Sequence, residues 1–475
     1  MSNSIKRYVG FDCGNSSVRT VVGSFDGSRI TTEVIHQVPN RELRGVTYDH
    51  WDILSIFHEM LKGMKLACDT YKDIHSFGIS TWGIDFGLLG SGGDLLGNPL
   101  CYRNPLGGQG LASRTETESR QMFDDTGILS LPMNSIFQLL GIRQHLPEYY
   151  ENADTLLLIP DLLNYLFTGE KNSELSIAST TQTVDMRNRA YSNNIFTSAG
   201  ISSRLFAPLV PHTRPRGVIK KEIAELYRIP QLTAISVPSH DTAAAVVTVP
   251  ARSENFAFIS SGTWSLIGTE VSEPLINDRV REAGFSNEGG IFDTITLLKN
   301  SCGMHILQNI KREMEFTGNR RYSWDEIVSL SAPVLKSEEV VTYDPNSDLL
   351  YHPDSMIEAI KALTGLTDIS HVLASSYRSL AQSYQKAITD LEAITGTSYD
   401  TIHIIGGGSR NDHLNQMTAD LTGKRVTSGP EEATSLGVIA VQLMHDHPDI
   451  TLMDLRKIIR ESVTIREFLP ENDHE

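Results

Sequence analysis

The chain has 475 residues, of which 40% are hydrophobic and 21% charged, a balance typical of a soluble globular protein with more than one domain. Its net charge of −17 argues against nucleic acid or an anionic membrane as a partner, although backbone amides and a metal ion can still hold phosphate groups. The four cysteines form no CxxC pair, the N-terminus has no apolar signal core, and the longest near-apolar run is broken by Pro160 and Asp161, so we expect a cytoplasmic protein with free thiols and no zinc site.

The first predicted element is a β-hairpin near the N-terminus. YVGFD, from Tyr8 to Asp12, has the pattern of a short apolar strand, CGNSS that of a turn, and VRTVVGSF that of a returning strand. Asp12 closes the first strand, and Mg²⁺ usually takes one or two carboxylates while it keeps several waters. Asp12 is therefore a candidate magnesium ligand, with a turn-forming aspartate as the alternative.

The following segments alternate helices and strands. WDILSIFHEMLKGMKLAC (51–68) repeats apolar residues at helical spacing, and SFGIS predicts a strand that TWGIDFGLL continues. In that continuation Trp82 and Asp85 are candidates for sugar stacking and hydrogen bonding, or alternatively fill a corner of the core. Helices are predicted over 134–145 and 155–167, and the proline-containing stretch 193–216 is predicted to be irregular.

The stretch 236–268 contains the clearest chemical signals. After Pro238 and Ser239, the alanine-rich DTAAAVV predicts a helix that begins at Asp241 and Thr242. A helix N-terminus favours negative charge, so Asp241 would stay ionised and accept a proton, which makes it the candidate general base. The alternative is that Asp241 is an ordinary N-cap. FAFIS, SSGT and WSLIG then predict a second hairpin, whose turn of small residues lets N–H groups approach a phosphate.

The two hairpins lie about 250 residues apart and share the pattern strand, small polar turn, strand. This repetition indicates an internally duplicated architecture in which one hairpin opens each half. A nucleotide held between two such halves is the arrangement of actin-like ATPases, which at this point is a fold-level analogy.

The last third of the chain continues the α/β pattern. NEGGIFDTITLLKNSCGMHILQNIKREM predicts two short strands and a helix, with Asn300 at their junction and Gln308 inside the helix. Residues 371–395 predict a long amphipathic helix that ends at Gly396. TIHIIGGGSRNDHLNQMTADL predicts strand, glycine turn and helix, and the turn leaves room for a flat ring or a phosphate, although it lacks the third glycine of a dinucleotide fingerprint. GPEEATSLGVIAVQLM predicts a last helix of small residues suited to close packing.

Several motifs together resemble one family. FDCGNSSVR, STWGIDFGLL, YRN, SHDTAAAVVTVP, SSGTWSLIG, NEGG, LKN and GGGSRNDHLNQMTADLTG are similar, in order and over residues 8–440, to the motifs of the FGGY carbohydrate kinases, and within that family to the rhamnulokinase subgroup. The chain departs from the usual family pattern at Cys13 and Asn15 in the first turn. It also departs at Asn104, where YRD is common.

The resemblance implies an α/β fold with two ribonuclease-H/actin-like domains, 1–245 and 246–475, flanking a nucleotide and sugar cleft. It implies a monomer or homodimer that uses ATP and Mg²⁺ to phosphorylate the C1 hydroxyl of a ketose, with L-rhamnulose as the expected substrate. It makes Asp241 the general base and Asp12 the Mg²⁺ carboxylate. The implied sugar contacts, besides Asp241, are Gly83, His240, Thr242 and Asn300. The implied nucleotide contacts are Asn15, Ser16, Ser17, Val18, Arg19, Thr263, Gln308 and Gly407.

Other functions stay open at this stage. One is an L-fuculose kinase or another ketose kinase of the same family, and a second is an actin-like ATP-binding protein without sugar kinase activity. A third is an inactive sugar-sensing relative, against which Asp12, Asp241 and the glycine turn argue together. Asp241 favours a sugar kinase over a filament or chaperone ATPase, because those ATPases need a positioned water rather than a base for a sugar hydroxyl.

Overall fold

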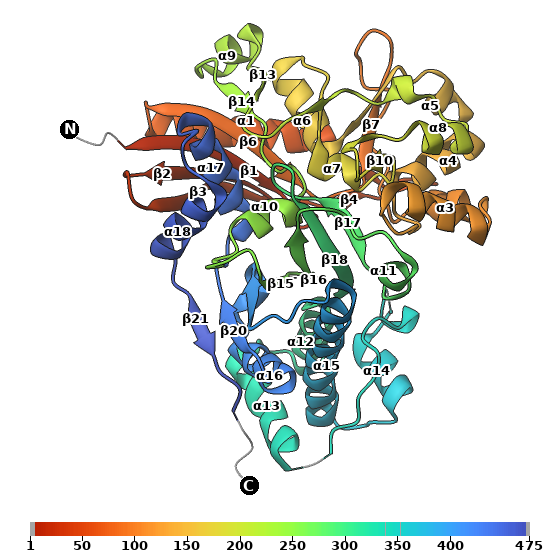
Figure 1. Cartoon of the computed structure of the whole chain (residues 1–475), viewed down its shortest axis with the longest axis vertical. Helices are drawn as coiled ribbons and strands as arrows, with labels where there is room; N and C mark the ends of the chain where they lie inside the picture. The colour runs from red at the N-terminus through yellow and green to blue at the C-terminus, as the bar shows by residue number, and fades with distance from the viewer. Residues whose placement is uncertain (1–4, 338, 352, 472–475) are drawn as a thin grey trace. The chain divides into compact units, whose positions relative to one another are not determined.

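The computed structural model describes residues 5–337, 339–351 and 353–471 (Figure 1). The chain forms two compact units, each made of three separate segments. The first unit comprises residues 1–252, 270–297 and 432–463, and the second comprises 253–269, 298–431 and 464–475. The predicted domains 1–245 and 246–475 are continuous stretches of sequence, and that division stays a prediction. Across the described residues we find no helix with the length and apolarity that crossing a bilayer requires.

The first unit is built on a six-stranded sheet with the order β13-β14-β6-β1-β2-β3. Its strands are β1 (Lys6–Cys13), β2 (Ser17–Phe25), β3 (Ile30–Pro39), β6 (Ile74–Thr81), β13 (Pro215–Val218) and β14 (Thr233–Ile235). β1, β2 and β3 pair antiparallel, whereas β6 runs parallel to β1 and β14 runs parallel to β6. The predicted N-terminal hairpin is therefore confirmed.

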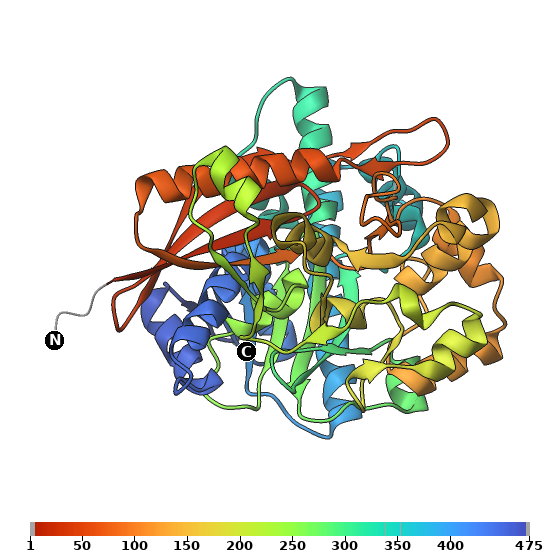
Figure 2. The same cartoon turned by 90° about the horizontal axis from the view of Figure 1, so that it is seen from above.

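Side chains that alternate along β1 feed two cores on opposite faces of this sheet. The helices that cover it are α1 (Ile53–Thr70), α6 (Ile159–Thr168), α10 (Asp241–Val247), α17 (Ala433–Asp446) and α18 (Leu452–Ser462). Val9 and Phe11 pack with α1 and α6, while Tyr8 packs with α10, α17 and α18. Figure 2 shows α1 and the blue α17 on opposite sides of the red strands. Because the side-chain period of a strand is two, Asp12 points to the same face as Tyr8, toward α17.

α10 and α17 approach each other closely where small residues meet. A Cβ on Gly437 would clash with the carbonyl oxygen of Ala244 in α10, so only glycine fits at this position of α17. The close packing predicted for the last small-residue helix is therefore confirmed.

We expect Gly437→Ala to lower the free energy of unfolding by about 1–3 kcal/mol, because the added methyl group must push α17 away from α10. The matched control is Gly108→Ala in α2 (Leu106–Ala112), where an added Cβ meets open space. That change should leave stability equal or slightly higher, since alanine restricts the unfolded chain. Denaturant unfolding of both variants measures the difference, and equal stabilities would contradict the packing argument.

A long insertion between β6 and β13 completes the first unit and has its own apolar core. Besides α6, its helices are α2, α3 (Glu116–Thr126), α4 (Ser135–His145), α5 (Pro147–Glu151), α7 (Leu175–Ser179), α8 (Asn193–Ala199) and the 3-10 turn η1 (Ser203–Leu205). Its strands are β7 (Phe86–Leu89), β8 (Thr155–Leu158), β9 (Ser173–Glu174), β10 (Val184–Asp185), β11 (Ala190–Tyr191) and β12 (Leu209–Val210). The remaining elements of the first unit are β4 (Glu42–Leu43), β5 (His50–Trp51), α9 (Lys221–Tyr227), α11 (Asp278–Glu282) and β17 (Ser286–Gly289).

Three sequence predictions in this insertion are wrong. TWGIDFGLL does not continue β6, which ends at Thr81, because the chain turns through Ile84 with a positive φ of 69° before β7 pairs with β8 in a separate sheet. The helix predicted over 155–167 is β8 followed by α6, and Pro160 lies in the first turn of α6. The stretch 193–216, predicted to be irregular, begins with α8.

The second unit repeats the topology of the first. Its strands belong to a seven-stranded sheet with the order β17-β18-β16-β15-β19-β20-β21, in which β17 is an edge strand. The other six are β15 (Ala257–Ser261), β16 (Trp264–Val271), β18 (Ile295–Cys302), β19 (Thr401–Ile405), β20 (Arg425–Ser428) and β21 (Arg466–Phe468). β15 and β16 form the second predicted hairpin, and β19 and β20 follow in parallel, as β6 and β14 do in the first unit. The predicted duplication is therefore confirmed.

Helices surround this second sheet. They are α12 (His305–Gly318), α13 (Trp324–Ser337), α14 (Met356–Thr364), α15 (Ile369–Thr395) and α16 (Asp412–Thr422), with the 3-10 turns η2 (Asp348–Leu350) and η3 (Gly407–Arg410). The predicted long helix is α15, and Gly396 ends it in a left-handed conformation with φ 68°.

Candidate active site

Three segments of the first unit meet where parallel strands of its sheet end. Asp12 lies near the end of β1, Thr81 ends β6, and the segment Ser239–Asp241 follows β14. The N–H of Thr81 donates to the carbonyl of Ser239 at 2.9 Å, and Thr81 and His240 form a parallel bridge. In α/β sheets ligands bind outside the carboxyl ends of the strands, so this edge is the expected place for a substrate.

Asp241 is the first residue of α10, as the sequence predicts, but it does not cap the helix. The N-cap is His240, and no side chain caps this end, so the interpretation of Asp241 as an ordinary N-cap is wrong. The Asp241 side chain is 38% exposed, and its Oδ1 lies 3.4 Å from Nε2 of His240. Thr242, which is buried, donates its hydroxyl to the same Oδ1 at 3.3 Å. Burial raises the pKa of Asp241, while His240 and Thr242 lower it.

His240 lies between two carboxylates. On the side away from Asp241, its Nδ1 is 3.1 Å from Oε2 of Glu288 in β17, and the side chains are only 10% and 13% exposed. At this distance the two side chains attract each other as an ion pair. Burial lowers the pKa of His240, but Glu288 and, more weakly, Asp241 raise it to about 9. The imidazole is therefore positively charged at neutral pH.

Gly83 lies directly behind the imidazole. A Cβ at this position would be 3.2 Å from Nε2 of His240 and 3.2 Å from the Cγ2 of Thr180. The first unit thus brings together Gly83, His240, Asp241 and Thr242, four of the five predicted sugar contacts. The fifth, Asn300, is exposed on β18 and belongs to the second unit.

Trp82, Asp85 and Asn104 have structural rather than substrate-facing positions. Asp85 is completely buried, and its Oδ2 accepts hydrogen bonds from Nε1 of Trp51 at 2.6 Å and Nε1 of Trp82 at 3.0 Å. Burial raises the pKa of this carboxyl to about 7. Asn104 uses its side-chain amide on the backbone of Asp49, as donor and as acceptor, at 2.8 Å each. Trp82 and Asp85 therefore fill a core corner, which was one of the two alternatives.

Asp12 is a nearly buried carboxylate with partners on α17 and β2. Its Oδ2 accepts a hydrogen bond from Oγ of Ser435 at 2.7 Å and lies 3.9 Å from the guanidinium of Arg19, its cross-strand neighbour. Arg19 also pairs with Glu432. Burial raises the pKa of Asp12, while Arg19 and Ser435 lower it.

Asp12 can offer a magnesium ion one carboxylate, but the protein does not surround this position with a full set of metal ligands. Among the described residues no group of three or more His, Cys, Asp or Glu side chains is placed to hold a metal. Mg²⁺ commonly binds one or two carboxylates, several waters and the phosphates of a substrate. Asp12 therefore suits a Mg²⁺ that arrives with a nucleotide and not a resident metal in a protein cage.

The turn between β1 and β2 and the first residues of β2 contain the remaining candidates of the first unit for a nucleotide. The N–H of Gly14 donates to the carbonyl of Ser17 at 2.8 Å, and the side chain of Asn40 holds the carbonyl of Gly14 at 2.9 Å. Oδ1 of Asn15 is buried and has no hydrogen-bond partner. The side chain of Val18 packs in the core, so it has no polar role. The predicted residues here are Asn15, Ser16, Ser17, Val18 and Arg19.

The second unit gathers the other predicted nucleotide residues. Thr263 is exposed in the turn between β15 and β16, and Gly407 follows β19, the parallel neighbour of β15. A Cβ on Gly407 would meet no atom within 4 Å, whereas one on Gly408 would clash with the side chain of Ser261. Gln308 is exposed on α12. The residue before this helix, Met304, donates its N–H to the carbonyl of Gly262, in the turn between β15 and β16, at 3.1 Å.

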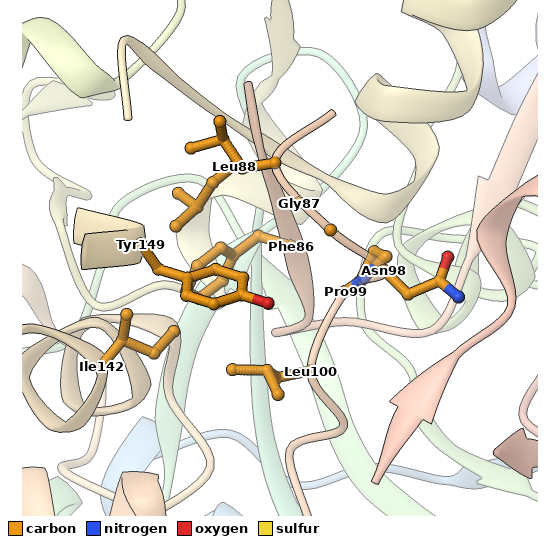
Figure 3. Close-up of a pocket in the computed structure, with 10 residues that line it drawn as sticks. Phe86, Gly87, Leu88, Asn98, Pro99, Leu100, Ile142 and Tyr149 are labelled. Atoms are coloured by element: carbon orange, nitrogen blue, oxygen red, sulfur yellow. The ribbon is translucent and has the colours of Figure 1, made fainter. Parts of the chain in front are cut away.

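The first unit also contains a separate pocket (Figure 3). Its walls are mostly apolar and include Phe86, Leu88, Pro99 and Leu100, with Tyr149 and an asparagine as polar members. None of the predicted site residues lines it, and it holds no acid or base. It therefore does not compete with the Asp241 region as a place for chemistry.

Comparison with known proteins identifies the family. Residues 7–248 match the N-terminal domain of the FGGY family of carbohydrate kinases, and residues 257–445 match its C-terminal domain. The chain belongs to the FGGY family. It is 32% identical over 474 residues to a rhamnulokinase of Bacteroides thetaiotaomicron, covering 98% of this chain and 96% of the relative. It is 34% identical over 465 residues to a rhamnulokinase of Oceanobacillus iheyensis, covering 96% and 97%.

Solved structures of other FGGY kinases share the fold. A gluconate kinase from Lactobacillus acidophilus has a TM-score of 0.83 at 16% identity, and a xylulose kinase from the same organism has 0.81 at 15%, each covering 98% of this chain and 94% of its own. The α/β class with ribonuclease-H/actin-like domains is therefore confirmed. As an FGGY protein the chain is a carbohydrate kinase, which removes an actin-like protein without kinase activity from the alternatives.

The sequence predictions did not place three residues of this region in the site: Glu288, Glu432 and Ser435. NEGG and GPEEAT were noticed in the sequence, but no local pattern pairs residue 288 with 240, or residue 435 with 12. Only the fold brings these groups together.

Proposed function

We propose that this kinase phosphorylates L-rhamnulose at its C1 hydroxyl with ATP, and that Asp241 is the general base. The observation that carries the proposal is a partly exposed carboxylate beside a cationic imidazole, at the strand-end edge of the first sheet. The rhamnulokinases similar over nearly their full length support the choice of sugar.

In the proposed reaction the C1 oxygen forms a bond to the γ-phosphorus while the bond from that phosphorus to the bridging oxygen of ADP breaks. Asp241 takes the hydroxyl proton as the new bond forms. Thr242 and His240 fix the carboxylate, since both contact its Oδ1. A Mg²⁺ at Asp12 would neutralise phosphate charge.

The remaining roles follow the family resemblance. Gly83 and Asn300 would contact the sugar. Thr263, Gln308 and Gly407, with residues 15–19, would bind ATP. A cytoplasmic location and a monomeric or homodimeric state stay predictions, the first supported by four buried, unpaired cysteines.

The sugar assignment is tested with a coupled assay over a panel of ketoses and polyols. We expect ketoses with a free C1 hydroxyl to be substrates and L-rhamnulose to have the highest kcat/KM. A higher value for L-fuculose or a pentulose would reject L-rhamnulose and leave another ketose kinase of the family as the function.

The role of Asp12 is tested by Asp12→Ala. Because Asp12 would hold a Mg²⁺ that comes with ATP, the variant should need more Mg²⁺ for half-maximal rate, while calorimetric sugar binding changes little. Asp73→Ala removes an exposed carboxylate next to the opposite end of the same strands and serves as the control. An unchanged Mg²⁺ requirement in Asp12→Ala would remove this residue from the metal's ligands.

A further inference from the structure

The NEGG motif has no role in the proposed reaction, yet its acid touches the site. Glu288 lies on β17, and its carboxylate is the group that faces Nδ1 of His240 at 3.1 Å. Glu288 itself is nearly buried, with 13% of its side chain exposed. A buried carboxylate costs free energy unless a positive or hydrogen-bonding partner compensates it, and His240 is the cation beside it.

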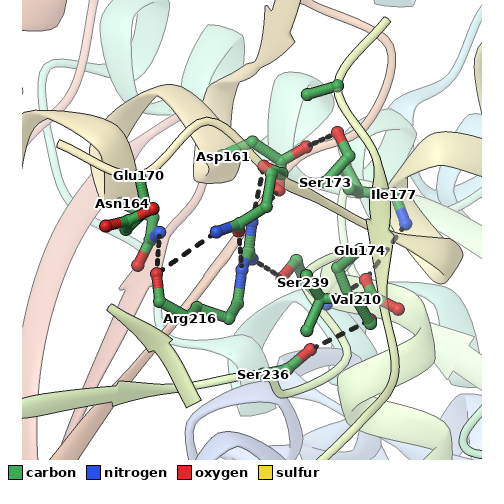
Figure 4. A network of polar contacts seen from close by, with 12 residues as sticks. Asp161, Asn164, Glu170, Ser173, Glu174, Ile177, Val210, Arg216, Ser236 and Ser239 are labelled. Carbon is green, nitrogen blue, oxygen red and sulfur yellow. Dashed lines mark hydrogen bonds and ion pairs between the residues drawn. The ribbon is translucent and has the colours of Figure 1, made fainter. Parts of the chain in front are cut away.

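A buried network around Glu174, which Figure 4 shows together with Ser239, fixes the chain just before Asp241. Glu174 is completely buried, and Oε2 accepts the N–H of Ser239 at 2.8 Å and the hydroxyl of Ser176 at 2.5 Å. The same hydroxyl oxygen accepts the N–H of His240 at 3.2 Å. Burial disfavours the Glu174 charge, but His212 and the hydrogen bonds lower its pKa to about 2. Glu174 is therefore a permanent anion that fixes the chain at residues 239 and 240.

The backbone of Glu288 is fixed by the same short helix. Oγ of Ser179, the last residue of α7, accepts the N–H of Gly289 at 2.9 Å. A Cβ on Gly289 would lie 3.0 Å from the carbonyl oxygen of Leu175, so β17 lies directly against α7. α7 thus contacts His240 and the residue that follows Glu288, and it links the two chain segments from which the pair comes.

A second tie runs through His212. Its Nδ1 accepts the N–H of Phe292 at 2.8 Å, and its Nε2 lies 2.6 Å from Oε1 of Glu174. Because Nδ1 is an acceptor, the proton is on Nε2 and is donated to Glu174. The loop after β17 is therefore anchored to the same buried carboxylate as the segment before Asp241.

We propose that Glu288 is the positioning residue of His240: its carboxylate holds Nδ1 of the charged imidazole, so that Nε2 is presented to Asp241 and to the sugar. This inference rests on the proposed function of Asp241. The arrangement fixes one ring orientation, because Nε2 faces Asp241 and Gly83 only when Nδ1 faces Glu288.

The charged groups around the imidazole come from several elements. Glu288 on β17, Asp241 on α10 and Glu174 before α7 are the acids near His240. Arg216 on β13 is the nearby cation, with a guanidinium nitrogen 3.4 Å from Oγ of Ser239. Without the charge of Glu288 the ring loses its largest stabilising partner, and both its charge and its orientation change.

The test combines Glu288→Gln, Glu288→Asp and the control Asp293→Asn. Asp293 is an exposed acid in the loop after β17, so its substitution removes a charge close in sequence without touching His240. The titration of the His240 ring is followed by NMR on ¹³C-histidine-labelled protein, and the signal absent from His240→Gln assigns the resonance. kcat and the sugar KM are measured on the same proteins.

We expect wild type, Asp293→Asn and Glu288→Asp to titrate near a pKa of about 9, and Glu288→Gln at least about one unit lower. kcat should fall about 10- to 100-fold in Glu288→Gln, with a small change in KM, since misplacement of a catalytic group costs about that much. Glu288→Asp should lose less of the rate than Glu288→Gln, because it keeps the negative charge. A purely structural role would lower kcat without moving the ring titration.

Two results overturn the proposal. One is a His240 titration in Glu288→Gln that equals wild type; the other, which needs no variant to fold, is a wild-type ring that titrates at or below the ordinary 6.5. If wild type phosphorylates no ketose, the proposed function fails, but the ring titrations still decide whether Glu288 holds His240.

Discussion

Replacing Asp241 by asparagine should lower kcat by about 10²–10⁴ while the sugar still binds within a few-fold of wild type. Asparagine keeps the shape of the side chain but cannot take a proton at neutral pH. Loss of helix capping does not contribute, because no side chain caps this end of α10. A coupled assay gives kcat, and calorimetry with the sugar gives binding.

The matched control is Asp278→Asn. Asp278 is also the first residue of a helix, α11, but its side chain is about half exposed and forms ion pairs with Arg120 and Arg281. Its rate should equal that of wild type. A kcat for Asp241→Asn within about 5-fold of wild type, well below the usual effect of a general base, would end the assignment.

The same assay has an expected pH dependence. Because burial raises the pKa of Asp241, its carboxylate loses the proton at a higher pH than an ordinary aspartate does. A base must be deprotonated to act, so kcat/KM of the wild type should rise with pH through that raised pKa. In Asp241→Asn the residual rate should lack this rise.

Arg216→Met should lower the free energy of unfolding by about 3–5 kcal/mol, because it leaves Asp161 as a buried charge without its cation. Nη2 of Arg216 is 2.6 Å from Oδ1 of Asp161, and the two side chains are 3% and 0% exposed. Arg216 also donates from Nε to Oδ1 of Asn172 at 2.7 Å. Denaturant unfolding measures the loss.

The size of this loss should depend on pH in a defined direction. Burial raises the pKa of Asp161 to about 6 even though Arg216 lowers it, and without Arg216 it rises further. As the pH falls, the folded variant takes up a proton at Asp161 and the unpaired charge disappears. The difference from wild type should therefore be larger at pH 8 than below about 6, the wild-type pKa of Asp161.

Two further variants show whether the loss in Arg216→Met comes from the buried ion pair. Arg120→Met breaks an ion pair with Asp278 whose side chains are 52% and 51% exposed, and it should cost less than about 1 kcal/mol. Adding Asp161→Asn to Arg216→Met removes the unpaired charge and should recover a large part of the loss. Equal costs for Arg216→Met and Arg120→Met would show that burial does not strengthen this pair.

Sequence patterns predicted the elements whose signals are local. The two hairpins follow from an apolar run, a turn of small residues and a second run, and α15 follows from a helical stripe ended by Gly396. The start of α10 was predicted because Pro238 and Ser239 precede an alanine-rich run. Each of these signals lies within a few residues of the element that it specifies.

The failures come from contacts that sequence does not encode locally. TWGIDFGLL has the pattern of a strand. The chain nevertheless turns there, because Ile84 has a left-handed backbone and the buried Asp85 accepts hydrogen bonds from the indoles of Trp51 and Trp82. The acid at 288 pairs with a histidine 48 residues earlier, and Ser435 bonds Asp12 across 423 positions. Such pairs depend on which strands are neighbours in the sheet and on which face of the sheet each side chain lies. Both can be known only once the order of the strands is known.

The three-segment make-up of the first unit has a consequence for biosynthesis. The face of its sheet that contains Tyr8 is covered by α10, α17 and α18, and the last two of these come from residues 432–463. When a ribosome has completed residue 252, about 180 residues remain before that cover begins, which takes roughly 10–40 s at ordinary elongation rates. During this time we expect the nascent chain to expose the part of this apolar face that α17 and α18 later cover, and chaperones bind such surfaces. We therefore expect a chain that ends before residue 432 to aggregate, because this apolar face would stay partly uncovered.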